Sequence, residues 1–313
     1  MVCEHKHLLD VQNLSVSFRM YDSGLEQKEL KVISDLSVSI DRGEILAIAG
    51  SSGSGKSLLA HAILGILPEN ATARGNMRYK GEIMTPEYQE KLRGRQIALV
   101  PQSVSYLDPL MSIERQVLGA GKNAKERKPA LKNIFGRLQL NESDGRLYPY
   151  QLSGGMARRV LVSTAVIGDA ELIIADEPTP GMQKQQALEA LKIFRELADE
   201  GKGVLLITHD VDLALEFADK IAVFYAGTTL ELASSKDFRG GEASLRHPYS
   251  KALWRAMPQN GFEPLDGFQP YAENLPSGCL FAPRCEMCSE RCKTEIPEMR
   301  ELRDGFVRCF HAT

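Results

Sequence analysis

The sequence predicts an α/β fold in which a parallel sheet is covered by helices on both faces. Apolar runs of strand length occur at 45–49, 96–102, 171–178 and 204–209. Stretches with apolar residues at helical spacing separate these runs. A strand without a polar face has to be buried on both sides, which is typical of parallel sheets. A glycine-rich turn directly after the first run leads into such a helical stretch.

The remaining elements follow from the same patterns. Residues 8–18 and 30–40 alternate apolar and polar side chains and predict two antiparallel strands, with a turn at 22–24 between them. We expect Pro68 to end the helix that follows the glycine-rich turn, and short strands and a helical turn over 69–95. The further predictions are helices within 112–167, over 184–199 and from the capping residue Asp210 to about Ala218, and then a strand over 221–225.

The composition changes from about residue 234, where glycine and proline become frequent and apolar runs become rare. We therefore place a domain boundary near 240, which separates a domain at 1–240 from an extension at 241–313. Within the extension, His247-Pro248-Tyr249 precedes a short helix to about Met257. The tail from 279 is small, polar and rich in cysteine.

The charge of the chain limits its partners. Its 313 residues carry a net charge of −3, and the isoelectric point is about 6.1, so no global basic field attracts nucleic acid. No apolar run approaches the ~20 residues that span a bilayer, and the N-terminus lacks an apolar signal core. We therefore expect a cytoplasmic protein that docks on a membrane protein. Disulfides are not expected there, although five of the six cysteines lie between 279 and 309.

The turn after the first buried strand fits the phosphate-binding pattern G-x-x-x-x-G-K-[ST]. Glycines at 50, 53 and 55 are predicted to take positive φ and to turn backbone N–H groups onto phosphate oxygens. The side chain of Lys56 reaches the β- and γ-phosphates in such loops, and the Ser57 hydroxyl ligates Mg²⁺. The predicted nucleotide-binding residues are Gly50, Ser51, Ser52, Gly53, Ser54, Gly55, Lys56, Ser57 and Leu58.

Two further motifs carry polar groups at the ends of apolar segments. Asp176 and Glu177 end the strand at 171–178, where a carboxylate holds Mg²⁺ and a second one polarises water. The alternative is a strand that ends in a solvated acidic turn. Leu152-Ser153-Gly154-Gly155-Met156 begins a helix, and is either a second anion-binding site or an ordinary N-cap.

The order of these motifs resembles that of the ATP-binding subunits of ABC transporters over residues 8–235. The resemblance implies a P-loop NTPase (RecA-like) core with antiparallel β and helical subdomains, the helical one at about 104–167. It implies that two subunits dimerise head to tail, so that Ser153, Gly154 and Gly155 contact the nucleotide on the partner. It also implies that Gln102 senses Mg²⁺, that His209 contacts the γ-phosphate, and that Phe18 stacks on adenine. Phe18 is alternatively a core aromatic of its strand.

The loop after Glu177 departs from the family pattern. Where the family has S-A-L-D, this chain has Pro180-Gly181-Met182-Gln183, so a neutral amide replaces an aspartate that faces the partner's site. This puts equal activity of the two ATP sites in doubt. It favours a dimer with a non-identical second ATPase subunit.

The extension resembles that of the oligopeptide, dipeptide and nickel importers. His247-Pro248-Tyr249 is followed by the pattern G-C-x-F-x-P-R-C at 278–285 and by further cysteines. In this subfamily such a tail is associated with a [4Fe–4S] cluster, for which the ligands here would be Cys279, Cys285, Cys292 and Cys309. Four thiolates also suit Zn²⁺, although zinc sites usually contain C-x2-C pairs, and free buried thiols are a third possibility. Cys288 is an additional thiol, and Cys3 is expected to be unremarkable.

The expected function is that of an ATP-hydrolysing subunit of an importer for peptides, nickel or metal chelates. The catalytic candidates are Lys56, Gln102, Glu177 and His209, and those for Mg²⁺ are Ser57, Gln102 and Asp176. The implied partners are a second ATPase subunit, two membrane permease subunits and an extracytoplasmic substrate-binding protein, with the chain peripheral on the cytoplasmic face. The alternatives are a low-activity regulatory half of a heterodimer and a soluble ABC ATPase without a transport role.

Overall fold

The computed structural model describes residues 7–21, 26–51, 53–119 and 126–313. Contacts within the chain divide it into two compact units. Unit 1 comprises Met1–Asp41, Leu46–Gln89 and Thr208–Thr313, and unit 2 comprises Arg42–Ile45 and Glu90–Ile207. The predicted α/β fold class is confirmed, because each unit contains parallel strands that alternate with helices along the chain.

Unit 1 contains an antiparallel sheet in the order β2-β1-β4-β5. Its strands are β1 (Leu9–Tyr21), β2 (Gln27–Ile40), β4 (Ala71–Tyr79) and β5 (Glu82–Ile83). The two predicted strands are present but longer than expected, since Arg19 pairs with Glu29 and Tyr21 with Gln27. Side-chain alternation did not indicate these ends, because backbone pairing continues where neither face is buried.

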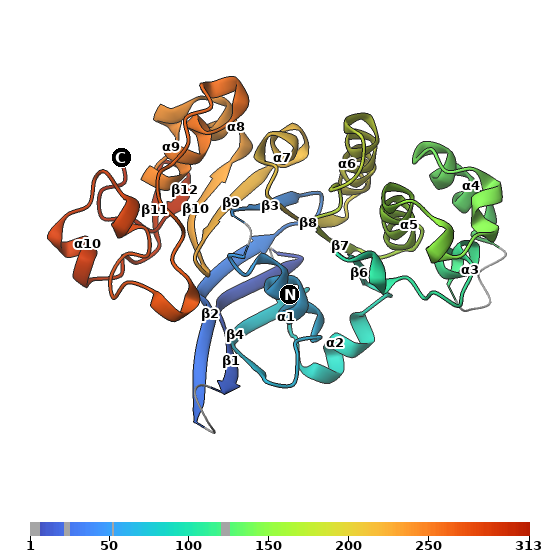
Figure 1. The fold of residues 1–313 in the computed structure, drawn as a ribbon, viewed down its shortest axis with the longest axis horizontal. Helices are drawn as coiled ribbons and strands as arrows, with labels where there is room; N and C mark the ends of the chain where they lie inside the picture. Colours follow the sequence, from blue (N-terminus) through green and yellow to red (C-terminus); the bar gives the residue numbers. More distant parts are fainter. Residues whose placement is uncertain (1–6, 22–25, 52, 120–125) are drawn as a thin grey trace, which may run out of the picture. The chain divides into compact units, whose positions relative to one another are not determined.

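The second set of strands in unit 1 has the order β11-β12-β10-β9-β3. Strands β3 (Ile45–Ala49) and β9 (Lys220–Tyr225) are parallel and lie where the sequence predicted them. Strand β10 (Thr228–Ser234) adds antiparallel to β9, and the hairpin β11 (Arg300–Leu302) and β12 (Gly305–Val307) adds to β10. These three strands were not predicted. The hairpin of β11 and β12 therefore forms the edge of this set of strands, next to β10 (Figure 1).

The helices of unit 1 are α1 (Lys56–Leu64), α2 (Pro86–Leu92), α7 (Val211–Phe217), α8 (Ser235–Arg239), α9 (Pro248–Arg255) and α10 (Glu290–Thr294). Helix α1 ends at Gly65, which has a φ of 63°, so the prediction that Pro68 ends it was wrong. A glycine in the left-handed conformation stops a helix earlier than a proline further along can. Asp210 caps α7 as predicted, because its Oδ1 accepts from the backbone N–H of Leu213 at 3.0 Å.

Unit 2 is built on three parallel strands in the order β8 (Gly203–Thr208), β7 (Leu172–Asp176) and β6 (Ile97–Val100). Nearly every residue of these strands is buried, as the apolar runs predicted. The helices are α3 (Ile113–Leu118), α4 (Lys128–Arg137), α5 (Gly154–Val166) and α6 (Lys184–Asp199). Short 3₁₀ turns separate α4 from α5, so the helical region at 112–167 consists of several segments (Figure 1).

The extension after residue 240 belongs by its contacts to unit 1, together with the P-loop strand and helix. The predicted short helix is present as α9, but it begins at Pro248 with His247 as its N-cap, two residues before the expected start. In the described ranges, no helix is both long enough and apolar enough to cross a membrane.

Candidate functional site

The P-loop of unit 1 connects the fully buried strand β3 to helix α1. Gly53 and Gly55 have φ values of 76° and 97°, as predicted for a loop that turns its N–H groups inward. Gly50 differs, because its φ is not positive. A Cβ at Gly50 would collide with the carbonyl oxygen of Phe224 on β9, so glycine is required there for close packing of two strands. Ser52 lies outside the described residues.

Polar side chains satisfy the carbonyls of this loop. The ammonium of Lys56 is 6% exposed and donates to the carbonyl oxygens of Gly50 and Ser51, each at 2.8 Å. The Ser54 hydroxyl also donates to the Ser51 carbonyl, at 2.8 Å. The loop therefore directs its carbonyls toward a buried cation. Its amide groups and the start of α1 remain suited to an anion such as a phosphate.

Four other residues that were predicted to contact the nucleotide have defined surroundings. Ser57 and Leu58 lie half-buried in the first turn of α1, and the Leu58 N–H donates to the Gly55 carbonyl at 3.0 Å. Phe18 is half-buried on β1, where it pairs with Leu30 and Ala71. This position is compatible with either prediction for Phe18. His209 is exposed directly after β8 and belongs to unit 1 with the P-loop.

Unit 2 presents two carboxylates at the end of β7. Asp176 is 2% exposed and is the last residue of the strand. Glu177 is 6% exposed, and its φ of 47° lies in the left-handed region, which L-residues other than glycine seldom adopt. Its backbone N–H still donates to the Ile207 carbonyl at 2.9 Å. The chain therefore holds a strained turn at Glu177, as is common at functional sites.

The Arg158 side chain on α5 contacts the loops that follow β6 and β7. Its Nη1 donates to the backbone carbonyls of Pro101, Gln102 and Glu177. Burial lowers the pKa of the Arg158 guanidinium, and the carboxylates of Glu177 and Asp176 oppose that change. No sequence pattern indicated a role for Arg158, which lies within the predicted helical region at 112–167. Its role was hidden because the contacts that define it lie 19 to 57 residues away.

Residues 152–156, here called the signature segment, lead into helix α5. The Ser153 hydroxyl is the N-cap and accepts from the Met156 N–H at 3.3 Å. Ser153 and Gly154 are exposed, and a Cβ at Gly155 would lie 3.0 Å from the Gly181 carbonyl oxygen. Gln183 is the N-cap residue of α6, and its N–H donates to the Gln186 side chain at 3.4 Å. The two loops are therefore adjacent, and Ser153 remains accessible.

Two family models match the chain: ABC transporter over residues 33–180, and oligopeptide/dipeptide transporter, C-terminal region, over residues 230–292. The chain is 33% identical over 321 residues to the dipeptide transport ATP-binding protein DppD of Haemophilus influenzae, covering 96% of this chain and 94% of that protein. The chain belongs to the family of ABC transporter ATP-binding subunits. It is an ATP-hydrolysing enzyme of the ABC type.

Other relatives agree with this membership. The dipeptide transport ATP-binding protein DppD of Escherichia coli is 32% identical over 317 residues, covering 95% of this chain and 94% of that protein. Among solved structures, a dimeric ATP-binding cassette in a post-hydrolysis state, bound to ADP and Pi, is 25% identical with a TM-score of 0.64. It covers 72% of this chain and 98% of that cassette. The predicted ABC ATPase fold is thereby confirmed.

The cysteines of this ABC ATPase gather in its tail. Cys279, Cys292 and Cys309 are buried, and Cys285 and Cys288 are half-buried. The Cys279 N–H donates to the Cys292 carbonyl at 2.8 Å, and the His311 N–H donates to the Cys309 Sγ at 3.3 Å. Electrostatic interactions link the Cys279, Cys285 and Cys309 thiols with one another. Cys309 also interacts with Cys292.

The thiols of Cys279, Cys285 and Cys309 are difficult to ionise in their present surroundings. Burial raises the pKa of Cys279 and Cys309, and raises that of Cys285 to about 11. Neighbouring thiolates would raise each value further, whereas a cationic centre would reverse the effect. Among the described residues, no group of three or more His, Cys, Asp or Glu is arranged to hold a metal ion. Cys3 lies outside the described residues.

Proposed function

We propose that this ABC ATPase drives the import of peptides through separate membrane permease subunits. The main support is the combination of the family membership with a C-terminal region of the oligopeptide/dipeptide type at residues 230–292. The relatives from Haemophilus influenzae and Escherichia coli, which match along almost their whole length, are named dipeptide transport ATP-binding proteins. The nickel and metal-chelate alternative from the sequence has no comparable support among these names.

The proposed chemistry assigns a role to each candidate side chain. Glu177 accepts a proton from water while the water oxygen attacks the γ-phosphorus, and the bond to the bridging oxygen breaks to release ADP. Lys56 and His209 stabilise the negative charge on the γ-phosphate oxygens. Ser57, Asp176 and Gln102 would hold Mg²⁺, which neutralises charge on the β- and γ-phosphates when bound. The buried carboxylate of Asp176 fits such an ion.

We further propose that the signature segment acts on a second subunit. The exposed Ser153 and Gly154 stand at the N-terminus of the thirteen-residue helix α5, which suits a phosphate from a partner chain. Phe18 supports adenine in this proposal. Gln183 supplies a neutral amide where the family has an aspartate, so the two ATP sites would differ in activity, and the proposed partner is a non-identical ATPase. Two permeases and an extracytoplasmic binding protein complete the proposed assembly at the cytoplasmic face of the membrane.

Reconstitution into liposomes tests this function. The chain is combined with its permeases, its partner ATPase and the binding protein, and peptide uptake and ATP hydrolysis are measured together. We expect peptides to stimulate both, and Glu177→Gln in this subunit to reduce both. Stimulation by nickel chelates but not by peptides would refute the peptide assignment. Hydrolysis unchanged by Glu177→Gln would instead support the low-activity regulatory alternative. Hydrolysis that never responds to permeases would support the soluble alternative.

We also propose that Cys279, Cys285, Cys292 and Cys309 hold a [4Fe–4S] cluster. The donor set is chemically suited, because four thiols lie in one tail, where Cys279 and Cys309 interact electrostatically with each other and with Cys292, and Cys285 interacts with Cys279 and Cys309. In such a cluster each cysteine binds a different iron, so the sulfurs stand further apart than around one ion. A single Zn²⁺ ion is the alternative, although zinc sites usually contain C-x2-C pairs and these four cysteines form none.

Metal analysis of anaerobically purified protein tests the cluster. About four iron atoms and four acid-labile sulfides per chain, lost in Cys285→Ser, would support it. Cys288→Ser is the matched control, because Cys288 is also half-buried but is not assigned as a ligand. Zinc without sulfide would replace the cluster by a zinc site, and metal-free protein would leave free buried thiols.

A further inference from the structure

A segment of the extension lies against the P-loop. Residues 265–271, here called the strap, run without regular structure toward the short 3₁₀ turn η7 (Ala272–Asn274), which contacts β2. A cavity of about 300 Å³ is lined by residues of both segments, among them Ser51, Gly53, Phe268 and Tyr271. All of these residues belong to unit 1. The strap is therefore a neighbour of the nucleotide-binding loop.

A direct hydrogen bond joins the two segments. The Ser51 hydroxyl donates to Gln269 Oε1 at 2.6 Å. Tyr249 on α9 also interacts with the Ser51 side chain, and this interaction opposes the rise that burial causes in the pKa of Tyr249. Two residues of the extension thus contact one P-loop side chain, although they lie 218 and 198 positions further along the chain. The family pattern leaves this position of the loop variable, so the motif did not predict a contact here.

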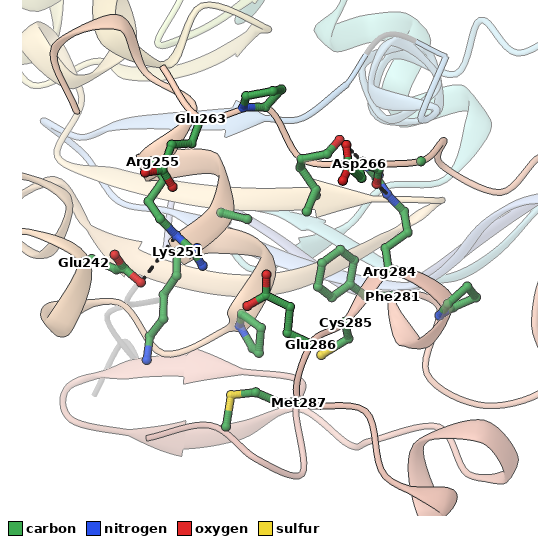
Figure 2. Close-up of a pocket in the computed structure, with 16 residues that line it drawn as sticks. Glu242, Lys251, Arg255, Glu263, Asp266, Phe281, Arg284, Cys285, Glu286 and Met287 are labelled. Carbon is green, nitrogen blue, oxygen red and sulfur yellow. Dashed lines mark hydrogen bonds and ion pairs between the residues drawn. The ribbon is translucent and has the colours of Figure 1, made fainter. Parts of the chain in front are cut away.

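Arg284 holds the other end of the strap in place. Its Nε donates to the Asp266 carbonyl at 2.8 Å, and its Nη2 donates to the Leu265 carbonyl at 3.1 Å. The Arg284 guanidinium also lies 5.9 Å from the centre of the Tyr225 ring on β9. Figure 2 shows Arg284 directed toward Asp266, with the neighbouring Cys285 beside it. Consecutive contacts therefore link the cysteine-rich tail to the strap, and the strap to the P-loop.

A hydrogen bond that holds the tip of the P-loop in place would favour nucleotide binding. Ser51 and Gly53 are exposed, and a Cβ at Gly53 would meet nothing within 4 Å. Glycine-rich backbone loses more conformational entropy than other backbone when it becomes ordered around a ligand. A tether that orders the loop beforehand reduces this cost and strengthens binding.

We propose that Gln269 is a positioning residue for nucleotide binding, which orders the P-loop through Ser51 while Arg284 holds the strap. Gln269 acts through the loop and not on the reacting atoms. The proposal rests on ATP binding by the P-loop. It does not depend on the transported substrate or on the cluster.

Titration of the full-length protein with a fluorescent ATP analogue tests the proposal. We expect Gln269→Ala to weaken binding about 3- to 10-fold, the range for one lost hydrogen bond. In ATPase assays, the same change should raise the KM for ATP more than it lowers kcat. Asn274→Ala is the matched control, because it removes an exposed amide from the adjoining turn η7, which lies outside the strap. Failure of the parent protein to bind the analogue would refute nucleotide binding itself.

A double-mutant cycle separates this contact from general destabilisation. If Gln269 acts through Ser51, then Ser51→Ala and Gln269→Ala together weaken binding no more than either change alone. Arg284→Gln should produce a similar loss that disappears in the Gln269→Ala background. Additive effects, an unchanged affinity in Gln269→Ala or tighter binding in that variant would each overturn the proposal. Tighter binding would mean that the strap competes with nucleotide.

Discussion

Glu177 occupies a left-handed backbone conformation directly after the buried strand β7, with its carboxylate almost fully buried. A residue placed so unfavourably is expected to be required for function and not for stability. We predict that Glu177→Gln lowers the rate of ATP hydrolysis about 100-fold or more, since it removes the general base. Binding of ATP, measured by titration with a fluorescent analogue, should persist because the P-loop is unchanged.

Glu171→Gln provides the control for this change. Glu171 precedes β7 and pairs with Arg42 at 2.6 Å, at the opposite end of the same strand. Its removal should alter hydrolysis less than about twofold, because an exposed ion pair contributes little. Equal losses in both variants would show that the carboxylate of Glu177 has no special role.

His247 makes the stability of the protein depend on pH. Burial lowers its pKa to about 3, from an ordinary value of 6.5. Between these values the unfolded chain binds a proton that the folded chain excludes, so the free energy of unfolding decreases as the pH falls. The charged groups beside it are the carboxylate of Glu231, which accepts from the His247 N–H at 2.8 Å, and the guanidinium of Arg246.

We expect His247→Asn to reduce this pH dependence by about 1.4 kcal/mol per pH unit below pH ~6. Asparagine retains an acceptor for the Tyr249 N–H, which the His247 Nδ1 now accepts at 2.9 Å. Urea unfolding at several pH values measures the effect. The control is His61→Asn, because that ring on α1 is only half-buried. Identical slopes in the parent and the His247 variant would contradict the prediction.

At the scale of secondary structure, helix α5 couples the signature segment to the two strand ends beside it. The Arg158 guanidinium joins the carbonyls of Pro101 and Gln102 after β6 to that of Glu177 after β7. We predict that Arg158→Met lowers kcat for ATP hydrolysis about 10-fold, because Glu177 and Gln102 lose their common support. ATP affinity should change less, since the P-loop belongs to the other unit.

Two variants of similar chemistry test whether the geometry of Arg158 matters. Arg146→Met removes an exposed arginine from the short turn before α5 and should leave kcat within about twofold. Arg158→Lys keeps the charge but not the planar fork of donors, so only partial activity is expected. Full activity in Arg158→Lys would show that charge alone suffices.

At the scale of the whole chain, a buried ion pair attaches the extension to β10. Arg246 is 1% exposed and bonds Glu231 on β10 at 3.2 Å and Asp237 at 2.9 Å. It also donates to the carbonyls of Leu302 and Arg303, which begin the turn of the tail hairpin. A Cβ at Gly305 would lie 2.7 Å from the Arg246 Cζ, so the hairpin closes tightly around this side chain.

Removal of one partner from such a pair leaves a buried charge without compensation. We therefore predict that Arg246→Met destabilises the protein by about 3–5 kcal/mol. Urea unfolding followed by the fluorescence of Trp254, the single tryptophan, reports on α9 in the extension. Lys293→Met, which removes an exposed ion pair with Glu290, should leave the free energy of unfolding nearly unchanged. A similar small cost for Arg246→Met would mean that the extension is attached by other contacts.

The sequence alone determined the parts of this protein that depend on interactions between neighbouring residues. Apolar runs of strand length identified β3, β6, β7 and β8, because burial on both faces excludes polar side chains. The order of the P-loop, the signature segment and the acidic strand end also sufficed to recognise the ABC family, which the comparisons confirmed. The bounds of α6 likewise followed from helical periodicity.

The tertiary structure decided everything that depends on residues distant in sequence. Gly50 is needed for contact with β9, Arg158 joins the loops after β6 and β7, and the tail hairpin completes a sheet with β10, yet none of these has a local signal. The strap is the extreme case, because Gln269 reaches Ser51 across 218 positions. Backbone carbonyls and serine hydroxyls form hydrogen bonds with any suitable partner, so a sequence pattern cannot indicate which distant arginine or glutamine will contact them.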